Sequence, residues 1–183
     1  MQPNKRPNQQ RSNAPENPLV GIVMGSDSDL PVMQEALEVL TSFGIPAEIT
    51  VASAHRSPKR VFEYASNASR RGLKVLIAGA GGAAHLAGVL AAETTLPVIG
   101  VPIASSPLAG WDALLATVQM PAGVPVATMA VGKAGARNAA IMVAQILAVA
   151  DGELQGRLQQ FKEELAHKVA EKADRLHEKL SAP

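Results

Sequence analysis

The feature that most constrains this chain is an alternation, repeated five times between residues 19 and 150, of short apolar runs with longer segments of helical periodicity. The runs predict strands over Leu19–Met24, Ala47–Ala52, Lys74–Ala78, Leu96–Val101 and Pro125–Val131. The longer segments predict helices over Asp29–Phe43, Ser57–Arg71, Ala83–Glu93, Leu108–Gln119 and Ala134–Ala150. Consecutive βα units favour a parallel sheet, and nearly continuous apolar strands are typical of sheets buried on both faces. We therefore predict a three-layer α/β/α sandwich around a five-stranded parallel sheet of flavodoxin-like order 2-1-3-4-5.

Both ends of the chain differ from this repeat. Residues 1–18 are rich in Asn, Gln and Pro and lack the apolar stretch of a signal peptide, so we expect a disordered leader. Residues 19–151 form a single α/β domain in this reading, and residues 152–183 add a C-terminal helix. That helix carries an apolar stripe made of Leu154, Leu158, Phe161, Leu165, Val169, Leu176 and Leu180. The stripe is longer than one face of the sheet needs, so we expect the helix to pack on a neighbouring subunit of a homo-oligomer.

Composition argues against several functional classes. The net charge is +1 and only 3% of the residues are aromatic, which speaks against nucleic-acid binding. The absence of cysteine excludes disulfides and thiolate chemistry. No uninterrupted apolar run approaches the roughly 20 residues of a membrane span, so we expect no membrane association and take the cytoplasm as the compartment.

Polar residues follow the first three predicted strands, whose carboxyl ends meet at one crevice in the predicted order. Ser26, Ser28 and Asp29 follow the first strand and begin a helix, where free N–H groups and hydroxyls suit a phosphate. Asp29 would repel a phosphate directly, so we expect it either to accept from ribose hydroxyls or to cap the helix. The sequence therefore predicts a nucleotide-like ligand at this crevice.

A histidine and an arginine follow the second strand, in the run Ser53-Ala54-His55-Arg56. Histidine titrates near neutral pH, and the guanidinium group of arginine suits phosphate. Two ordinary polar residues at a helix start would also explain this run taken alone. Beside the other motifs, the pair indicates acid–base chemistry on an anionic substrate.

The segment after the third strand also permits two other interpretations, a dinucleotide-binding loop and, together with His55, a metal site. Gly79-x-Gly81-x-x-Ala84 matches a dinucleotide fingerprint, but it follows the third strand and lacks the acidic residue expected about 20 residues further on. His55 and His85 would supply two metal ligands, with no carboxylate at a ligand spacing. We therefore expect neither metal nor cofactor, and proton transfer on a phosphorylated metabolite.

Four motifs in this order resemble the N5-carboxyaminoimidazole ribonucleotide mutase family of bacterial purine biosynthesis. They are Met24-Gly25-Ser26-x-Ser28-Asp29, Ser53-Ala54-His55-Arg56, Gly79-Ala80-Gly81-Gly82-Ala83-Ala84-His85-Leu86 and Val118-Gln119-Met120-Pro121. The resemblance implies a cofactor-free, octameric mutase that moves a carboxylate from the exocyclic nitrogen to carbon 4 of aminoimidazole ribonucleotide. It further implies that His55 is the catalytic acid and base. The implied ligand-binding residues are Ser26, Ser28, Asp29, Ser53, Arg56, Gly81, Gly82 and His85. The segment Ser105–Gly110 diverges from the family pattern, which puts any role as a lid in doubt.

Three alternatives remain at this point. One is the related carboxylase, which uses aminoimidazole ribonucleotide and free carbon dioxide. Another is a non-catalytic nucleotide-binding module that oligomerises through its last helix. A nicotinamide-dependent dehydrogenase is the most distant of the three.

Overall fold

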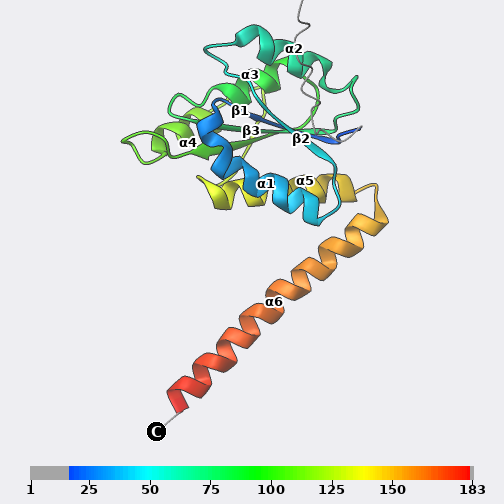
Figure 1. Cartoon of the computed structure of the whole chain (residues 1–183), viewed down its shortest axis with the longest axis vertical. Helices are drawn as coiled ribbons and strands as arrows, with labels where there is room; N and C mark the ends of the chain where they lie inside the picture. The colour runs from blue at the N-terminus through cyan, green and yellow to red at the C-terminus, as the bar shows by residue number, and fades with distance from the viewer. Residues whose placement is uncertain (1–16, 182–183) are drawn as a thin grey trace, which may run out of the picture.

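A computed structural model describes residues 17–181 and contains a parallel five-stranded sheet of order β2-β1-β3-β4-β5 (Figure 1). This is the predicted fold and strand order. The strands are β1 (Val20–Met24), β2 (Ala47–Val51), β3 (Val75–Gly81), β4 (Val98–Ile103) and β5 (Ala127–Thr128). The expected leader lies outside the described residues except at Asn17 and Pro18.

Helices cover both faces of the sheet, as predicted (Figure 1). One face packs against α1 (Leu30–Ser42) and α5 (Lys133–Ala148). The other carries α2 (Pro58–Ala68), α3 (Leu86–Glu93) and α4 (Trp111–Val118). Successive strand residues divide between the two cores: Ile22 and Ile77 face α1 and α5, whereas Val23 and Leu76 face α2 and α3.

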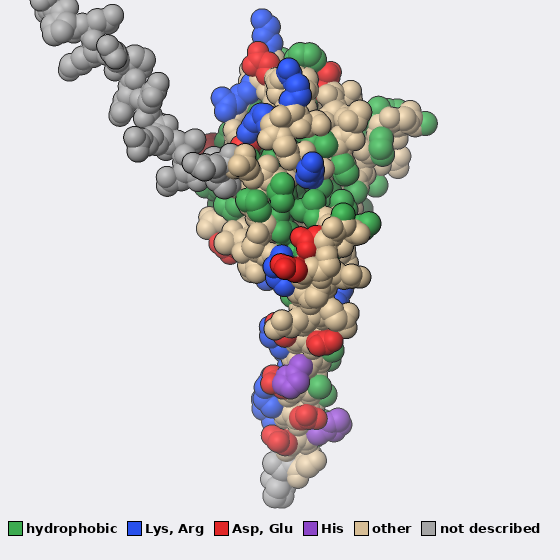
Figure 2. Space-filling model, turned by 90° about the vertical axis from the view of Figure 1, so that its right-hand side faces the viewer, with side chains coloured by type: hydrophobic (Ala, Val, Ile, Leu, Met, Phe, Trp, Pro, Cys, Tyr) green, Lys and Arg blue, Asp and Glu red, His purple; other side chains and the backbone are tan. Residues whose placement is uncertain are grey.

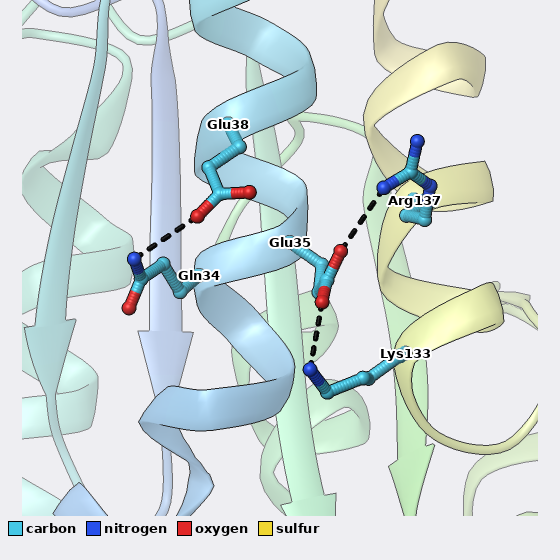
Figure 3. Close-up of polar contacts among 5 residues, drawn as sticks. All are labelled: Gln34, Glu35, Glu38, Lys133 and Arg137. Atoms are coloured by element: carbon cyan, nitrogen blue, oxygen red, sulfur yellow. Dashed lines mark hydrogen bonds and ion pairs between the residues drawn. The ribbon is translucent and has the colours of Figure 1, made fainter.

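An ion-pair cluster joins the two helices of the first face (Figure 3). The Glu35 carboxylate of α1 accepts from Lys133 Nζ at 2.8 Å and from Arg137 at 3.1 Å, both on α5. Glu38, one turn further along α1, accepts from the amide of Gln34 at 3.0 Å. The two cations lower the pKa of Glu35 below its ordinary value.

Two strands differ in length from the prediction. β3 continues through Gly81, so the first glycines of the expected loop pair with β4, with Gly81 opposite Ile103. β5 is regular only at Ala127 and Thr128, although the nitrogens of Met129 and Gly132 still donate to β4 carbonyls. Its outer side lies at the edge of the sheet, so it lacks the second neighbour that would keep it straight.

Several helices begin later than predicted. A 3-10 turn, η1 (Asp27–Asp29), precedes α1, and α3 and α4 each start three residues after their predicted first residue. Ser57, the first residue of the predicted second helix, lies just before α2 and makes no side-chain cap. Its hydroxyl instead accepts from the nitrogen of Ser53 at 2.9 Å, which folds the chain tightly after β2.

The C-terminal helix α6 (Gly152–Ser181) packs on its own domain at its start and then leaves it (Figure 1). Leu154 and Leu158 are buried in the α1–α5 core, and the ring of Phe161 meets that of Phe43 at 5.5 Å. Beyond this point the side chains of α6 are exposed, although Leu165 and Lys168 still border a cavity with α1 and α5. Figure 2 shows hydrophobic side chains among the charged ones along α6. The expected packing on a neighbour therefore concerns only the distal half. No helix within residues 17–181 is long and apolar enough to cross a membrane.

Candidate active site

The carboxyl ends of β1, β2 and β3 surround a cavity of about 340 Å³. β2 lies on one side of β1 and β3 on the other, so the strand order reverses at β1. Open α/β sheets bind ligands at such a switch point. The lining residues are Gly25, Ser26, Ser28, Asp29, Ser53, Ala54, His55, Arg56, Ala80, Gly81, Ala83, Leu86 and Ser105.

The turn after β1 is held by its own side chains. Ser26 Oγ accepts from the nitrogen of Ser28 at 3.3 Å, and Asp29 Oδ2 accepts from the nitrogen of Ser26 at 3.1 Å. This reciprocal capping box fixes the turn before any ligand arrives. The Ser28 hydroxyl donates to Ser26 Oγ at 2.8 Å, and the Ser26 hydroxyl donates to Asp27 Oδ1 at 3.2 Å, so both hydroxyls must rotate before they can donate to an anion.

Asp29 is the most buried charged side chain of the site, with 5% of its surface exposed. Burial raises the pKa of its carboxyl above the ordinary value, while the bond from Ser26 and the charge of Arg56 partly oppose that rise. The carboxyl has further lone pairs besides the one that Ser26 occupies. A sugar hydroxyl is a suitable donor to them, because it carries no charge to repel.

Arg56 reaches from the end of β2 across to the turn after β1. Its terminal nitrogen donates to the carbonyl of Gly25 at 3.0 Å, and its backbone nitrogen donates to Ser53 Oγ at 3.2 Å. The guanidinium group has five N–H donors, so these anchors leave capacity for an anion held by Ser26 and Ser28.

His55 and His85 form a close pair. His55 Nε2 lies 2.9 Å from His85 Nδ1, and the rings meet edge to face with centroids 5.0 Å apart. Only one hydrogen fits between two nitrogens at this distance, so one ring donates and the other accepts. The ring of His55 is exposed to the cavity and offers one nitrogen not engaged by His85. The pair can therefore hold and release a proton at the cavity wall.

The glycine-rich end of β3 brings a second loop close to the site. A Cβ on Gly81 would collide with the Ser105 side chain and lie 3.0 Å from the carbonyl oxygen of Ile103. Glycine at this position therefore lets the segment after β4 approach the cavity. Gly82 follows with φ +58°, a left-handed conformation that turns the chain toward His85.

The structure brings the predicted site residues together. Seven line the cavity, namely Ser26, Ser28, Asp29, Ser53, His55, Arg56 and Gly81. His85 is not among the residues that line the cavity, but it contacts His55, which is. Gly82 lies in the turn that leads from β3 to His85. Ser105 was not predicted, although it follows the fourth strand, where a side chain at the carboxyl edge is expected. Among the described residues, no cluster of three or more His, Asp or Glu side chains could hold a metal ion.

Comparison with known proteins places this geometry in context. The model of the AIR carboxylase family matches residues 19–168. The chain is 56% identical over 163 residues to the N5-carboxyaminoimidazole ribonucleotide mutase of Pyrococcus horikoshii, covering 89% of this chain and 91% of that protein. The mutase of Thermotoga maritima is also 56% identical, over 161 residues, with 88% and 93% covered. The crystal structure of Treponema denticola PurE superimposes with a TM-score of 0.79 at 29% identity, over 87% of this chain and 98% of that one.

Proposed function

The chain belongs to the AIR carboxylase family, and we propose that it is an N5-carboxyaminoimidazole ribonucleotide mutase of purine biosynthesis. The reaction moves a carboxylate from the exocyclic nitrogen to carbon 4 of the imidazole and gives 4-carboxy-5-aminoimidazole ribonucleotide. It is an isomerisation, because no atom is gained or lost. The observation that carries the proposal is the His55–His85 pair beside a turn suited to phosphate, in a chain 56% identical to such mutases.

The proposed mechanism uses His55 twice. Protonated His55 donates to the exocyclic nitrogen as the N–C bond breaks, which releases carbon dioxide and leaves the free amine. Carbon 4 then attacks the carbon dioxide and forms the new C–C bond. Neutral His55 finally accepts the proton from carbon 4, which restores the aromatic ring and returns His55 to its starting state. A group that donates and accepts in one cycle works best with a pKa near the operating pH, which histidine supplies.

The other residues bind and orient in this proposal. The hydroxyls of Ser26 and Ser28 and the guanidinium group of Arg56 hold the phosphate, and Asp29 accepts from the ribose hydroxyls. Ser53 supports Arg56 through its hydroxyl, at 3.2 Å from the Arg56 nitrogen. Gly81 and Gly82 let the backbone approach the flat base, and His85 orients His55.

The cavity wall suits a reaction with a free carbon dioxide intermediate. Ala54, Ala80, Ala83 and Leu86 contribute small or apolar side chains around His55. Such a wall offers few hydrogen bonds to water and would keep carbon dioxide close to carbon 4. We propose that no cofactor takes part.

The proposal includes an assembly and a compartment. We expect a homo-octamer, as the resemblance to the mutase family implies, with the distal half of α6 packing on a neighbouring subunit. Leu176 and Leu180 are 56% and 76% exposed in the single chain, which supports this contact. We expect the enzyme to act in the cytoplasm on a small nucleotide.

The test supplies the N5-carboxylated nucleotide to purified protein without ATP and follows the carbon-carboxylated product by absorbance. The proposal predicts turnover that survives extensive dialysis against a chelator. A parallel reaction supplies aminoimidazole ribonucleotide with carbon dioxide. Turnover in this second reaction alone would identify the related carboxylase, and binding without turnover in either would identify a nucleotide-binding module.

A further inference from the structure

The cavity extends past the carboxyl end of β3 to the segment that follows β4. Among the described residues that line it, Ser105 alone comes from that segment. A Cβ at Gly81 would collide with Ser105 Oγ, so this hydroxyl lies directly beside the end of β3. The backbone nitrogen of Ser105 donates to the carbonyl of Ile103 at 3.0 Å, which fixes the residue at the end of β4.

The Ser105 hydroxyl differs from the other hydroxyls of the cavity wall in its bonding. Ser28 donates to Ser26 Oγ, and Ser53 Oγ accepts from a backbone nitrogen. Within residues 17–181, Ser105 Oγ has no hydrogen-bond partner. Its hydroxyl is therefore available to a ligand without first breaking a bond inside the protein.

The loop after Ser105 holds this hydroxyl in place through bonds of its own. Ser106 Oγ accepts from the nitrogen of Leu108 at 3.1 Å, and the Ser106 carbonyl accepts from the nitrogen of Ala109 at 3.2 Å. Ser106 does not line the cavity, so its hydroxyl supports the loop while that of Ser105 faces the ligand space. A donor that is already in position loses little freedom when a ligand binds to it.

The part of the cavity around Ser105 offers few other polar side chains. Its lining residues are Ala80, Gly81, Ala83, Leu86 and Ser105, and we call this part the β4 end of the cavity. Of these five side chains, only that of Ser105 can donate a hydrogen bond. Arg56 lies at the opposite end, where it donates to the Gly25 carbonyl. A negative group at the β4 end would depend on the Ser105 hydroxyl for a side-chain donor, because an unpaired charge in an apolar wall is costly.

The proposed binding mode places such a negative group at the β4 end. β1, β3 and β4 are successive neighbours in the sheet, and neighbouring strands lie about 4.8 Å apart, so the turn after β1 is roughly 10 Å from the end of β4. This separation resembles that between the phosphate of a ribonucleotide and the far edge of its base. The ring of His55 also extends toward β3, where it contacts His85. With the phosphate at the turn after β1, the base edge that carries the carboxylate lies between His55 and Ser105.

We infer that the Ser105 hydroxyl donates a hydrogen bond to the carboxylate of the nucleotide, which is on the exocyclic nitrogen in the substrate and on carbon 4 in the product. The inference rests on the proposed function and deepens it, because it names a residue that distinguishes a carboxylated nucleotide from the same nucleotide without that group. A hydroxyl binds an anionic oxygen more strongly than a neutral one. Ser105 therefore determines specificity, while His55 carries the proton.

Calorimetry with two nucleotides tests the inference without catalysis. We would measure the Kd of 4-carboxy-5-aminoimidazole ribonucleotide and of aminoimidazole ribonucleotide for the wild-type protein and for Ser105→Ala. The Kd of the carboxylated nucleotide should rise about 10-fold, because a hydrogen bond to a charged group is lost. The Kd of aminoimidazole ribonucleotide should stay unchanged. In steady-state kinetics, KM should rise with a much smaller change in kcat.

Further variants separate the bond to the carboxylate from damage to the loop. Ser105→Asp places a negative charge beside the carboxylate and should weaken its binding more than Ser105→Asn, which has a similar shape and no charge. Ser106→Ala removes the neighbouring hydroxyl, outside the cavity wall, and should not change the ratio of the two Kd values. Circular dichroism confirms that each variant is folded.

The inference is overturned if Ser105→Ala weakens both nucleotides equally or leaves the binding of the carboxylated one unchanged. It is also overturned if Ser105→Asp and Ser105→Asn bind the carboxylated nucleotide equally well. These results would leave the proposed function standing, because that function fails on a different observation, the absence of turnover by the wild-type protein. A wild-type protein that binds neither nucleotide would overturn both.

Discussion

Two polar clusters border β2, and they differ in what their members bind. At the carboxyl end of the strand, Arg56 and His55 face the cavity beside the turn after β1. Nearer its start, Glu48 lies against Tyr64 of α2 and Arg71 after α2. Both clusters place an arginine beside an ionisable group and border a hollow of the surface, so composition alone does not tell them apart.

The polar groups of the Glu48 cluster bind one another. Tyr64 Oη donates to Glu48 Oε1 at 2.7 Å, Arg71 forms an ion pair with Glu48 Oε2, and the Arg71 guanidinium lies over the Tyr64 ring, 5.4 Å from its centroid. Burial, followed by the bond to Glu48, raises the pKa of the Tyr64 hydroxyl far above its ordinary value. Tyr64 also fills the space beside Gly21, where a Cβ would collide with its hydroxyl. The members of this cluster satisfy one another and stabilise the packing of α2 on the sheet.

The cluster of the proposed active site keeps bonding capacity for a ligand. Arg56 is anchored by the Gly25 carbonyl and the Ser53 hydroxyl, neither of which carries a charge, and His55 is paired with a second histidine. Among the described residues Arg56 makes no ion pair with a carboxylate, although its charge acts on the nearby Asp29. The comparison indicates that a ligand-binding cluster differs from a structural one in the hydrogen-bond donors and charges that its own residues leave unpaired. The residue types in the two clusters are similar.

The largest expected effect is on His55, the proposed proton carrier. His55→Asn should lower kcat by about 10²–10⁴-fold, because the amide cannot donate and accept a proton near neutral pH. Binding of the product nucleotide, measured by calorimetry, should persist. Tyr64→Phe removes a polar hydrogen from the Glu48 cluster and should leave kcat unchanged. Near-normal turnover in His55→Asn would remove His55 from its proposed role.

A smaller effect should follow from replacing the anion-binding arginine. Arg56→Lys keeps the charge but loses the planar fork, so we expect KM to rise about 10- to 100-fold with a smaller change in kcat. Steady-state kinetics measure both constants. Arg71→Lys in the Glu48 cluster is the matched control and should leave KM unchanged. An equal rise in KM for both variants would mean that Arg56 has no special part in binding.

The Glu48 cluster should respond in stability, with no effect on catalysis. Tyr64→Phe removes the hydrogen bond to Glu48 and should lower the free energy of unfolding by about 1 kcal/mol, measured by urea denaturation. Ser66→Ala on the same helix removes an exposed bond to a helix carbonyl and is the control for helix propensity. If Tyr64→Phe unfolds at the wild-type midpoint, the Glu48 cluster contributes nothing to stability.

The smallest expected effect concerns the ion pairs between α1 and α5 (Figure 3). Because Lys133 and Arg137 lower the pKa of Glu35, the folded state binds the proton of Glu35 less readily than the unfolded state does. This contribution is present above the unfolded pKa, near 4.5, and is lost as the pH falls through the lower folded pKa. Glu35→Gln should therefore lower the unfolding midpoint slightly at pH 7 and by less at pH 3, with Glu38→Gln as the control on the same helix. A deficit of equal size at both pH values would mean that the charge of Glu35 is not responsible.

The fold was predictable because one local signal is repeated. Five apolar runs bounded by helical periodicity identify a doubly wound parallel sheet, and strand exits carrying Ser26, His55 and Arg56 place the site at the switch point. Features that depend on distant neighbours were missed. The glycines of β3 resemble a loop until β4 pairs with them, and Ser105 reaches the cavity only because Gly81 lacks a side chain. Periodicity also marks one apolar side of α6 from Leu154 to Leu180, but the extent to which the domain covers that side depends on the tertiary packing around Phe43 and Phe161.

The most direct test is a crystal structure of the protein with the product nucleotide bound. The account predicts the phosphate among Ser26, Ser28 and Arg56, with carbon 4 of the imidazole facing His55. The groove lined by Arg60, Tyr64 and Arg71 should be empty of nucleotide. A nucleotide bound in that groove, or one bound in the crevice with carbon 4 turned away from His55, would contradict the central claim.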